Sequence, residues 1–276
     1  MQQDNPENSP IRILHFSDFH LNGDKIEDAQ HVLNNMLKSL QQINTERQID
    51  LVIFTGDMLE QGGVGYGNNL VQGFTDFQSK VINPILTTLN LPHNRFIFTP
   101  GNHDVNREAD KRYFDNNLLS SSRDVISINN LLKDSEIAED LGKVDDFKRF
   151  EKEYYDNCDH ITYCKGKFVS TFEMMINGYN IGISSLNTVW QCGKGDNTPA
   201  LGICQITECK EHLEGKDVKI ALSHYPYYEL EKEWKEIEEL LSKEFDIYFS
   251  GHSHSGHSRF IAATNKNYFF DYLFFL

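Results

Sequence analysis

The chain has 276 residues, of which 39% are hydrophobic and 12% aromatic, so it can bury a sizeable core, and a disordered protein is excluded. Its 26 basic and 41 acidic residues give a formal charge of −15, which argues against broad binding to nucleic acid or anionic membranes. Five cysteines without a C-x-x-C pair disfavour a disulfide framework, and no apolar run is long enough to span a bilayer, so we expect a cytoplasmic protein without membrane contact.

Strand-like and helix-like segments alternate along the first hundred residues. Strands are predicted at three apolar runs, which are Ile11–Phe16, Leu51–Thr55 and Phe96–Thr99. Apolar residues at helical spacing predict helices over Asp24–Thr45 and Leu70–Leu89, with Pro84 interrupting the second. This β-α-β-α-β order predicts a layered sheet with right-handed crossovers.

Residues 105–165 break the alternation. The stretch is charged and helix-prone, notably over Ser135–Asp156, and has no clear strand. We expect it to be a helical cap inserted over the active face of one domain that spans residues 1–276. Four further strands are predicted after it, at Phe168–Ile176, Tyr179–Leu186, Val218–Ser223 and Ile247–Ser250. Asn177-Gly178 is typical of a hairpin turn, and an amphipathic helix runs from Leu230 to Phe245.

The C-terminal segment is unusually apolar. Phe260–Ala263 predicts a strand, and Tyr268–Leu276 is apolar at almost every position. This end either completes a sheet or needs a partner surface, which would be a missing C-terminal domain or an oligomer contact.

Five short polar segments each follow a predicted strand: Asp18-Phe19-His20, Gly56-Asp57, Gly101-Asn102-His103-Asp104, Ser223-His224 and Gly251-His252-Ser253-His254. Strand ends are where open α/β sheets place ligand sites. Residues two apart on a strand share a face, so Asp18 should converge with His20, and His252 with His254. Each segment alone has an ordinary explanation as a turn or a core histidine. Together they offer carboxylate, imidazole and amide groups, which suit a transition-metal site.

The series D-x-H, GD, GNHD, H and GHxH resembles the calcineurin-like metallophosphoesterase superfamily, and within it the single-domain bacterial phosphodiesterases, from Ile11 to His254. The resemblance implies a four-layer α/β/β/α sandwich of two mixed sheets. It also implies two divalent metal ions, which could be Mn²⁺, Fe²⁺/Fe³⁺ or Zn²⁺. The residues matching the ligands of the first ion are Asp18, His20, Asp57 and His254. Those matching the second are Asp57, Asn102, His224 and His252.

In this resemblance Asp57 bridges the two ions, and a bridging water that they activate attacks phosphorus in line. His103 matches the family's catalytic histidine, which stabilises the phosphoryl group or protonates the leaving oxygen, and Asp104 would orient its ring. The expected partner is therefore a phosphorylated small molecule, with a nucleotide-like phosphodiester as the first guess.

Three further residues are weaker substrate-site candidates: Asn187 at a strand end, Arg107 just after GNHD, and His257 just after GHxH. The tyrosines that follow His224 could pack against the insertion or stack on a base. Two other functions stay open. A nuclease shares these motifs, although the charge of −15 counts against it. A non-catalytic scaffold is disfavoured because the ligand pattern is complete.

Overall fold

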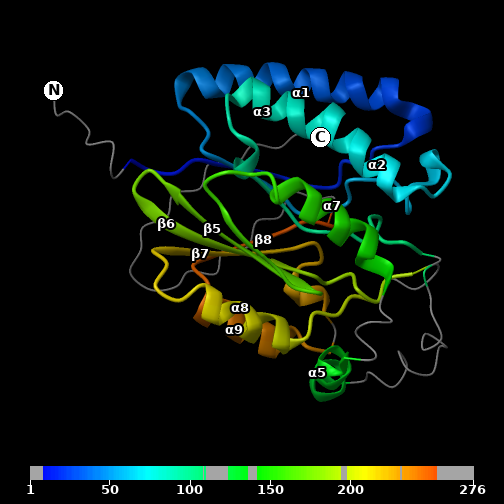
Figure 1. The fold of residues 1–276 in the computed structure, drawn as a ribbon, viewed down its shortest axis with the longest axis vertical. Helices are drawn as coiled ribbons and strands as arrows, with labels where there is room; N and C mark the ends of the chain where they lie inside the picture. The colour runs from blue at the N-terminus through cyan, green and yellow to red at the C-terminus, as the bar shows by residue number, and fades with distance from the viewer. Residues whose placement is uncertain are drawn as a thin grey trace.

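The computed structural model describes residues 9–107, 109, 124–135, 142–193, 198–230 and 232–253. Over these residues the chain has a mixed α/β fold with two sheets, as expected (Figure 1). The first sheet has the order β1-β2-β3, with strands β1 (Ile13–Phe16), β2 (Leu51–Phe54) and β3 (Phe96–Phe98). The second has the order β4-β5-β6-β7-β8, with strands β4 (Thr162–Lys165), β5 (Val169–Ile176), β6 (Tyr179–Leu186), β7 (Val218–Ser223) and β8 (Ile247–Ser250).

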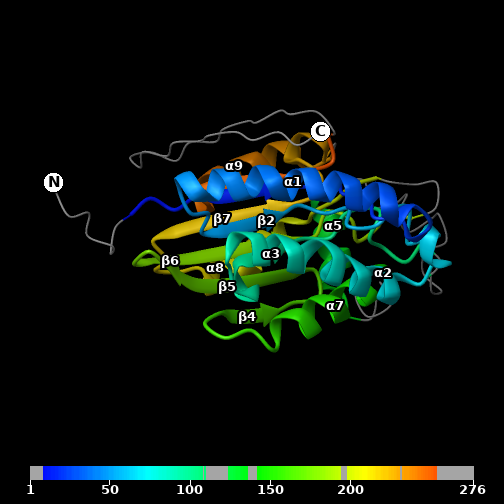
Figure 2. The same ribbon diagram turned by 90° about the horizontal axis from the view of Figure 1, so that it is seen from above.

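Helices flank the sheets on both sides. Figure 1 shows α1, α2 and α3 along one side of the molecule and α8 and α9 along the other, and Figure 2 shows the same elements from above. The helices of the described residues are α1 (Ile26–Glu46), α2 (Leu70–Phe77), α3 (Asn83–Leu89), α5 (Val125–Lys133), α7 (Asp145–Tyr155), α8 (Ile203–His212) and α9 (Trp234–Glu244). Shorter helical turns are η2 (Gly23–Lys25), η3 (Val64–Tyr66), η4 (Gln78–Ile82), η5 (His93–Arg95), η6 (Gly142–Val144) and η7 (Tyr227–Glu229). In the described part of the chain no helix is long and apolar enough to cross a membrane.

Strand direction differs between the sheets. Both pairings of the first sheet are parallel, so over its described strands this sheet is not mixed, contrary to expectation. The second sheet is mixed, because β4-β5-β6 is antiparallel and β6-β7-β8 is parallel. The predicted hairpin between β5 and β6 is confirmed. Asn177 and Gly178 have φ values of 51° and 85°, the left-handed conformation that two-residue hairpin turns require.

The predicted interruption at Pro84 is also confirmed, and it has a definite form. Pro84 lacks an N–H and cannot continue the hydrogen-bond ladder of α2. The backbone inserts the π-helical turn η4, in which the Asn83 N–H bonds the Gln78 carbonyl, and α3 begins at Asn83 with the proline in its first turn.

The described part of the expected insertion differs from the prediction. It contains an edge strand, β4, and its helix α7 packs against α2 with Phe147, Phe150 and Tyr154 in the main core. The charged sequence of α7 concealed this role, because Lys148 and Glu151 are buried as an ion pair at 2.6 Å. Helix α8 was not predicted. The cap itself stays a prediction, since residues 110–123 and 136–141 lie outside the described residues, as do the predicted strand Phe260–Ala263 and the apolar end.

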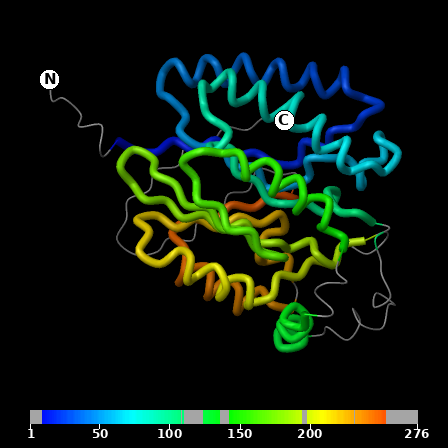
Figure 3. The backbone as a smooth tube through the Cα atoms, in the orientation of Figure 1, coloured from blue at the N-terminus to red at the C-terminus, as the bar shows by residue number. Residues whose placement is uncertain are grey.

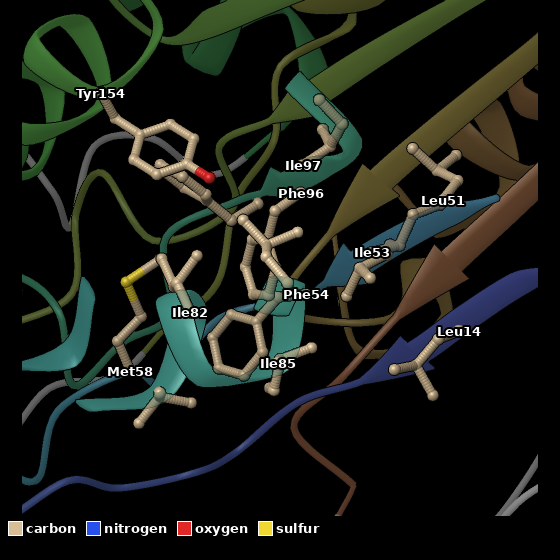
Figure 4. Packing of buried hydrophobic residues seen from close by; sticks show 14 of the residues in the cluster. Leu14, Leu51, Ile53, Phe54, Met58, Ile82, Ile85, Phe96, Ile97 and Tyr154 are labelled. Atoms are coloured by element: carbon tan, nitrogen blue, oxygen red, sulfur yellow. The ribbon is translucent and has the colours of Figure 1, made fainter. Parts of the chain in front are cut away.

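Packing brings the carboxyl ends of two strand sets together. Strand β2 is fully buried, and Figure 4 shows its residues Leu51, Ile53 and Phe54 packed with Phe96 and Ile97 of β3. Because the strands of the first sheet run parallel, β1, β2 and β3 all end at one edge. Strands β6, β7 and β8 likewise end together, and the chain trace shows how the two sets adjoin (Figure 3). The Thr99 hydroxyl after β3 donates to the Leu186 carbonyl at the end of β6, at 3.4 Å.

Candidate metal centre

The segment after β1 holds Asp18 and His20 by backbone pairing to the segment after β2. The Asp18 N–H donates to the Gly56 carbonyl at 2.9 Å, and the His20 N–H donates to the Asp57 carbonyl at 3.0 Å. Asp18 and His20 have φ values of 58° and 52°, in the left-handed region. Strand alternation does not apply to this pair, because β1 ends at Phe16 and both residues lie in the loop that follows; their expected convergence stays a prediction.

Glycines let three of the loops touch through their backbones. A Cβ added to Gly101 would lie 2.1 Å from the Asp57 nitrogen, and one added to Gly56 would lie 2.7 Å from the Gly101 Cα. A Cβ on Gly251, after β8, would lie 2.7 Å from the Thr55 carbonyl oxygen. The glycine at the start of three of the polar motifs is thus a packing requirement, and it brings the loops after β2, β3 and β8 together.

The ring of His224 lies at the centre of the site and is fully buried. Its Nδ1 faces the Thr55 carbonyl at 2.8 Å, so in the neutral ring Nδ1 carries the proton and the Nε2 lone pair is directed at the centre. Around that Nε2 lie the Asn102 Oδ1 at 3.0 Å, the His252 Nδ1 at 3.2 Å and the Asp57 Oδ2 at 3.4 Å. Two imidazole nitrogens, a carboxylate oxygen and an amide oxygen thus converge from four different strand ends. This donor set fits a transition-metal ion.

Asp57 also belongs to a second group of potential ligands. The ligand atoms of His20, Asp57 and His103 lie within 4.8 Å of one another, as do those of Asp57, His224 and His252. Asp57 is common to both of these groups, and the first of them contains His103 in place of the predicted ligand Asp18. The bridging role of Asp57 stays a prediction. The predicted ligand Asp18 lies beside these groups, where its Oδ2 accepts the backbone N–H of His252 at 3.1 Å. The predicted ligand His254 lies outside the described residues.

The electrostatics of the centre favour a cation. Burial opposes ionisation of Asp57, yet the charge and hydrogen bond of His224, with a contribution from His103, hold the pKa of this carboxyl well below its usual range. Burial likewise opposes charging of His224, but the adjacent Asp57 raises the pKa of its ring to about 9. Both shifts show that positive charge is stabilised between these two groups.

Asp104 has a different role from the one expected. Its carboxylate accepts three buried backbone N–H groups, from Leu59 and Gly101 at 2.9 Å and from Met58 at 3.1 Å. Burial and the nearby charge of Asp57 raise the pKa of Asp104 to about 7, against the effect of these donors. Both oxygens are thus engaged by the loop after β2 and by Gly101, and the carboxylate ties two loops together instead of orienting the ring of His103.

A backbone amide orients His103 instead. The Gln61 N–H donates to the His103 Nδ1 at 3.0 Å, and the His103 N–H donates to the Asp57 Oδ1 at 2.8 Å. In this arrangement the neutral ring carries its proton on Nε2. Burial lowers the pKa of His103, partly offset by the charge of Asp57, so the neutral ring is favoured. The contact from Gln61 could not be predicted from the sequence, because its donor is a backbone N–H, which nearly every residue type has.

Two of the three substrate candidates are described. Asn187 directly follows β6 and is buried; its Oδ1 accepts the Val189 N–H at 2.9 Å, and its Nδ2 has no hydrogen-bond partner in the described structure. Arg107 reaches the Asn102 carbonyl with its Nη2 at 3.5 Å, so its charge lies beside the centre. His257 lies outside the described residues. Of the three tyrosines after His224, Tyr225 and Tyr227 are buried and Tyr228 is exposed. The substrate roles stay predictions.

A known protein family matches most of the chain. Residues 11–256 match the family model of the calcineurin-like phosphoesterases, and the chain belongs to this family. It is 21% identical over 278 residues to the uncharacterized metallophosphoesterase-like protein YydB of Bacillus subtilis (strain 168), covering 95% of this chain and 52% of that protein. The chain thus spans about half the length of this relative. The solved structure of Haemophilus influenzae NAD nucleotidase (NadN) aligns with 88% of this chain and 38% of its own, with a TM-score of 0.40 and 17% identity.

Proposed function

We propose that the protein hydrolyses phosphate esters with two divalent metal ions and that it is a phosphodiesterase for small nucleotide-like substrates. The observation that carries the proposal is the convergence of Asp57, Asn102 and His252 on the Nε2 of His224, with Asp57 shared by a second ligand group. The four-layer α/β/β/α sandwich of the family belongs to the same proposal, supported by helices on both sides of the two sheets.

The second ion would be held by Asp57, Asn102, His224 and His252, whose ligand atoms already face one another. The first would be held by Asp18, His20 and Asp57, with His254 matching the family motif. When bound, two such ions lower the pKa of a water between them and neutralise charge on the attacking and leaving oxygens.

The chain's own residues divide the remaining work. Asn102 contributes a neutral oxygen, which limits negative charge where an anionic substrate must bind. Gln61 holds the His103 ring with its Nε2–H available as a donor to a phosphoryl or leaving oxygen. Arg107 places a permanent positive charge beside Asn102, where it can attract the substrate phosphate.

The negative charge of the chain favours small substrates over nucleic acids. A formal charge of −15 disfavours a long polyanion, whose binding depends on many basic contacts. A small diester carries a single negative charge at its phosphate and is repelled far less. We therefore place a nuclease second.

The test is hydrolysis of bis(p-nitrophenyl) phosphate by metal-depleted protein to which Mn²⁺, Fe²⁺ or Zn²⁺ is returned. Turnover should require the ion. Asp57→Asn should lose about 10³-fold or more in kcat, and His103→Ala about 10²- to 10⁴-fold. Asp28→Asn, on the exposed face of α1, is the matched control and should keep full activity.

No turnover with any of these ions, or full activity in Asp57→Asn, would show the proposal to be wrong. Comparing a cyclic mononucleotide with a single-stranded oligonucleotide separates the two substrate classes. Faster, salt-sensitive cleavage of the oligonucleotide would favour the nuclease.

A further inference from the structure

Glu229 lies outside every motif of the site, yet its side chain lies beside one of the predicted metal ligands, His252. It ends the short helix η7, five residues after His224. Its Oε2 lies 3.7 Å from the Nε2 of His252. No sequence pattern distinguishes this half-buried carboxylate from the other acidic residues of the chain.

The two ring nitrogens of His252 face different surroundings. Nδ1 points to the metal centre, where it lies 3.2 Å from the His224 Nε2, and Nε2 points to Glu229. A neutral imidazole carries one proton. A carboxylate beside Nε2 favours the tautomer with the proton there, which leaves the Nδ1 lone pair directed at the centre. The ring is further held by Tyr225, whose ring centroid lies 4.0 Å away.

We propose that Glu229 is a positioning residue for His252: it fixes the tautomer and orientation of the ring and makes its Nδ1 a stronger metal ligand. The proposal rests on the proposed function, in which His252 binds the second ion. Histidine ligands of metals commonly donate their other N–H to a carboxylate or a carbonyl, which orients the ring and raises its basicity.

The neighbouring ligand His224 shows the same arrangement with a different partner. Its Nδ1 faces the Thr55 carbonyl, a neutral backbone acceptor inside the core. His252 lies closer to the surface, with 29% of its side chain exposed, and its Nε2 faces the Glu229 carboxylate. The Glu229 carboxylate thus faces the outer ring nitrogen of His252, as the Thr55 carbonyl faces that of His224.

An ordinary surface ion pair is the competing explanation, and it predicts something different. The side chains of His252 and Glu229 are 29% and 33% exposed, and pairs at such positions contribute little to stability. A surface pair would leave metal binding unchanged when it is removed. A positioning carboxylate would leave folding nearly unchanged and weaken one metal site.

The experiment measures Mn²⁺ binding to the whole chain by calorimetry, with electron paramagnetic resonance to follow coupling between the two ions. Glu229→Met keeps the length of the side chain and removes the acceptor. It should weaken the second Mn²⁺ by about 10- to 100-fold and leave the first within about threefold. Glu229→Gln keeps an acceptor oxygen and should recover part of that loss. Glu239→Met, on the exposed face of α9, is the matched control.

A Glu229→Met protein that binds both ions within twofold of wild type would overturn the proposal, as would Gln and Met variants with equal losses. If Glu229→Met does not fold, as judged by circular dichroism, Glu229→Ala provides the same comparison. A wild-type protein that binds no Mn²⁺ would instead refute the proposed function, on which this inference depends.

Discussion

The two sheets contribute to the metal centre in different ways. The loops after β1, β2 and β3 are joined by main-chain hydrogen bonds, such as Asp18 to Gly56 and His20 to Asp57. The ligands that follow β7 and β8 depend on the first sheet. His224 is held by the Thr55 carbonyl, and the His252 N–H donates to Asp18. The first half of the site is therefore joined by its own main chain. The second half has one such bond, from the Gly251 N–H to the His224 carbonyl at 3.0 Å, and its histidines also contact the first half.

This asymmetry has a practical meaning. A change in the loops of the first sheet should disturb all ligands at once, because the second sheet's histidines are docked on those loops. A change near His252 should affect one ion and leave the other in place. The following substitutions test this difference, beginning with the largest expected effect on stability.

Gly101→Ala should disrupt the first half most severely. The new Cβ would lie 2.1 Å from the Asp57 nitrogen, so the loops after β2 and β3 must move apart. We expect a loss of at least about 3 kcal/mol in the free energy of unfolding, measured by urea denaturation without metal. Gly67→Ala is the control, because its φ of 59° is also left-handed but its Cβ would meet nothing within 4 Å. It should cost about 1 kcal/mol. Equal losses in the two variants would contradict the steric argument.

Asp104→Asn should loosen the same loops without a steric clash. The amide keeps one acceptor oxygen and turns an NH₂ group toward at least one of the three buried N–H donors, from Met58, Leu59 and Gly101. An unsatisfied buried donor costs about 1 to 3 kcal/mol. Urea denaturation should show a loss in this range, and binding of both metal ions should weaken together. Weakening of one ion alone would argue against the asymmetry.

His15 contacts the same residue that holds His224. Its Nε2 lies 2.9 Å from the Thr55 hydroxyl, and the Thr55 carbonyl lies 2.8 Å from the Nδ1 of His224. Burial lowers the pKa of His15 to about 4. The unfolded chain, with a pKa of about 6.5, then binds the proton more readily. The stability from this group is present above about pH 6.5 and is lost as the pH falls toward 4.

We expect the wild type to lose about 3 kcal/mol more than His15→Gln between pH 7 and pH 4, in chelator so that metal binding does not contribute. Thermal or urea unfolding at several pH values measures the difference. Parallel pH profiles for the two proteins would show that the ring is not protected from protonation.

Much of the site could be predicted from the sequence, because its chemistry lies in short motifs and parallel strands bring their carboxyl ends to one edge. The bounds of β6, β7 and β8 agree with the prediction, and so does the meeting of Asp57, Asn102, His224 and His252.

What could not be predicted depends on side-chain direction and on buried charge. Asp104 turns away from the ring of His103 because consecutive residues of a loop point differently, and no spacing rule reports this. The helix α7 looked like a solvated cap because its pattern counts Lys148 and Glu151 as surface residues, whereas the fold buries them against Ser170. The position of Glu229 beside His252 could not be predicted, because the two residues are brought together only by the fold.

At four predicted ligands, the left-handed backbone makes stability and metal binding favour different residues. Asp18, His20, Asp57 and His252 all have φ between 52° and 68°, a conformation that costs a residue with a Cβ about 1 kcal/mol or more. Glycine would relieve that cost at each position and would remove the ligand. A stability-driven selection should therefore drift toward glycine at these four sites as soon as the demand for metal is lifted.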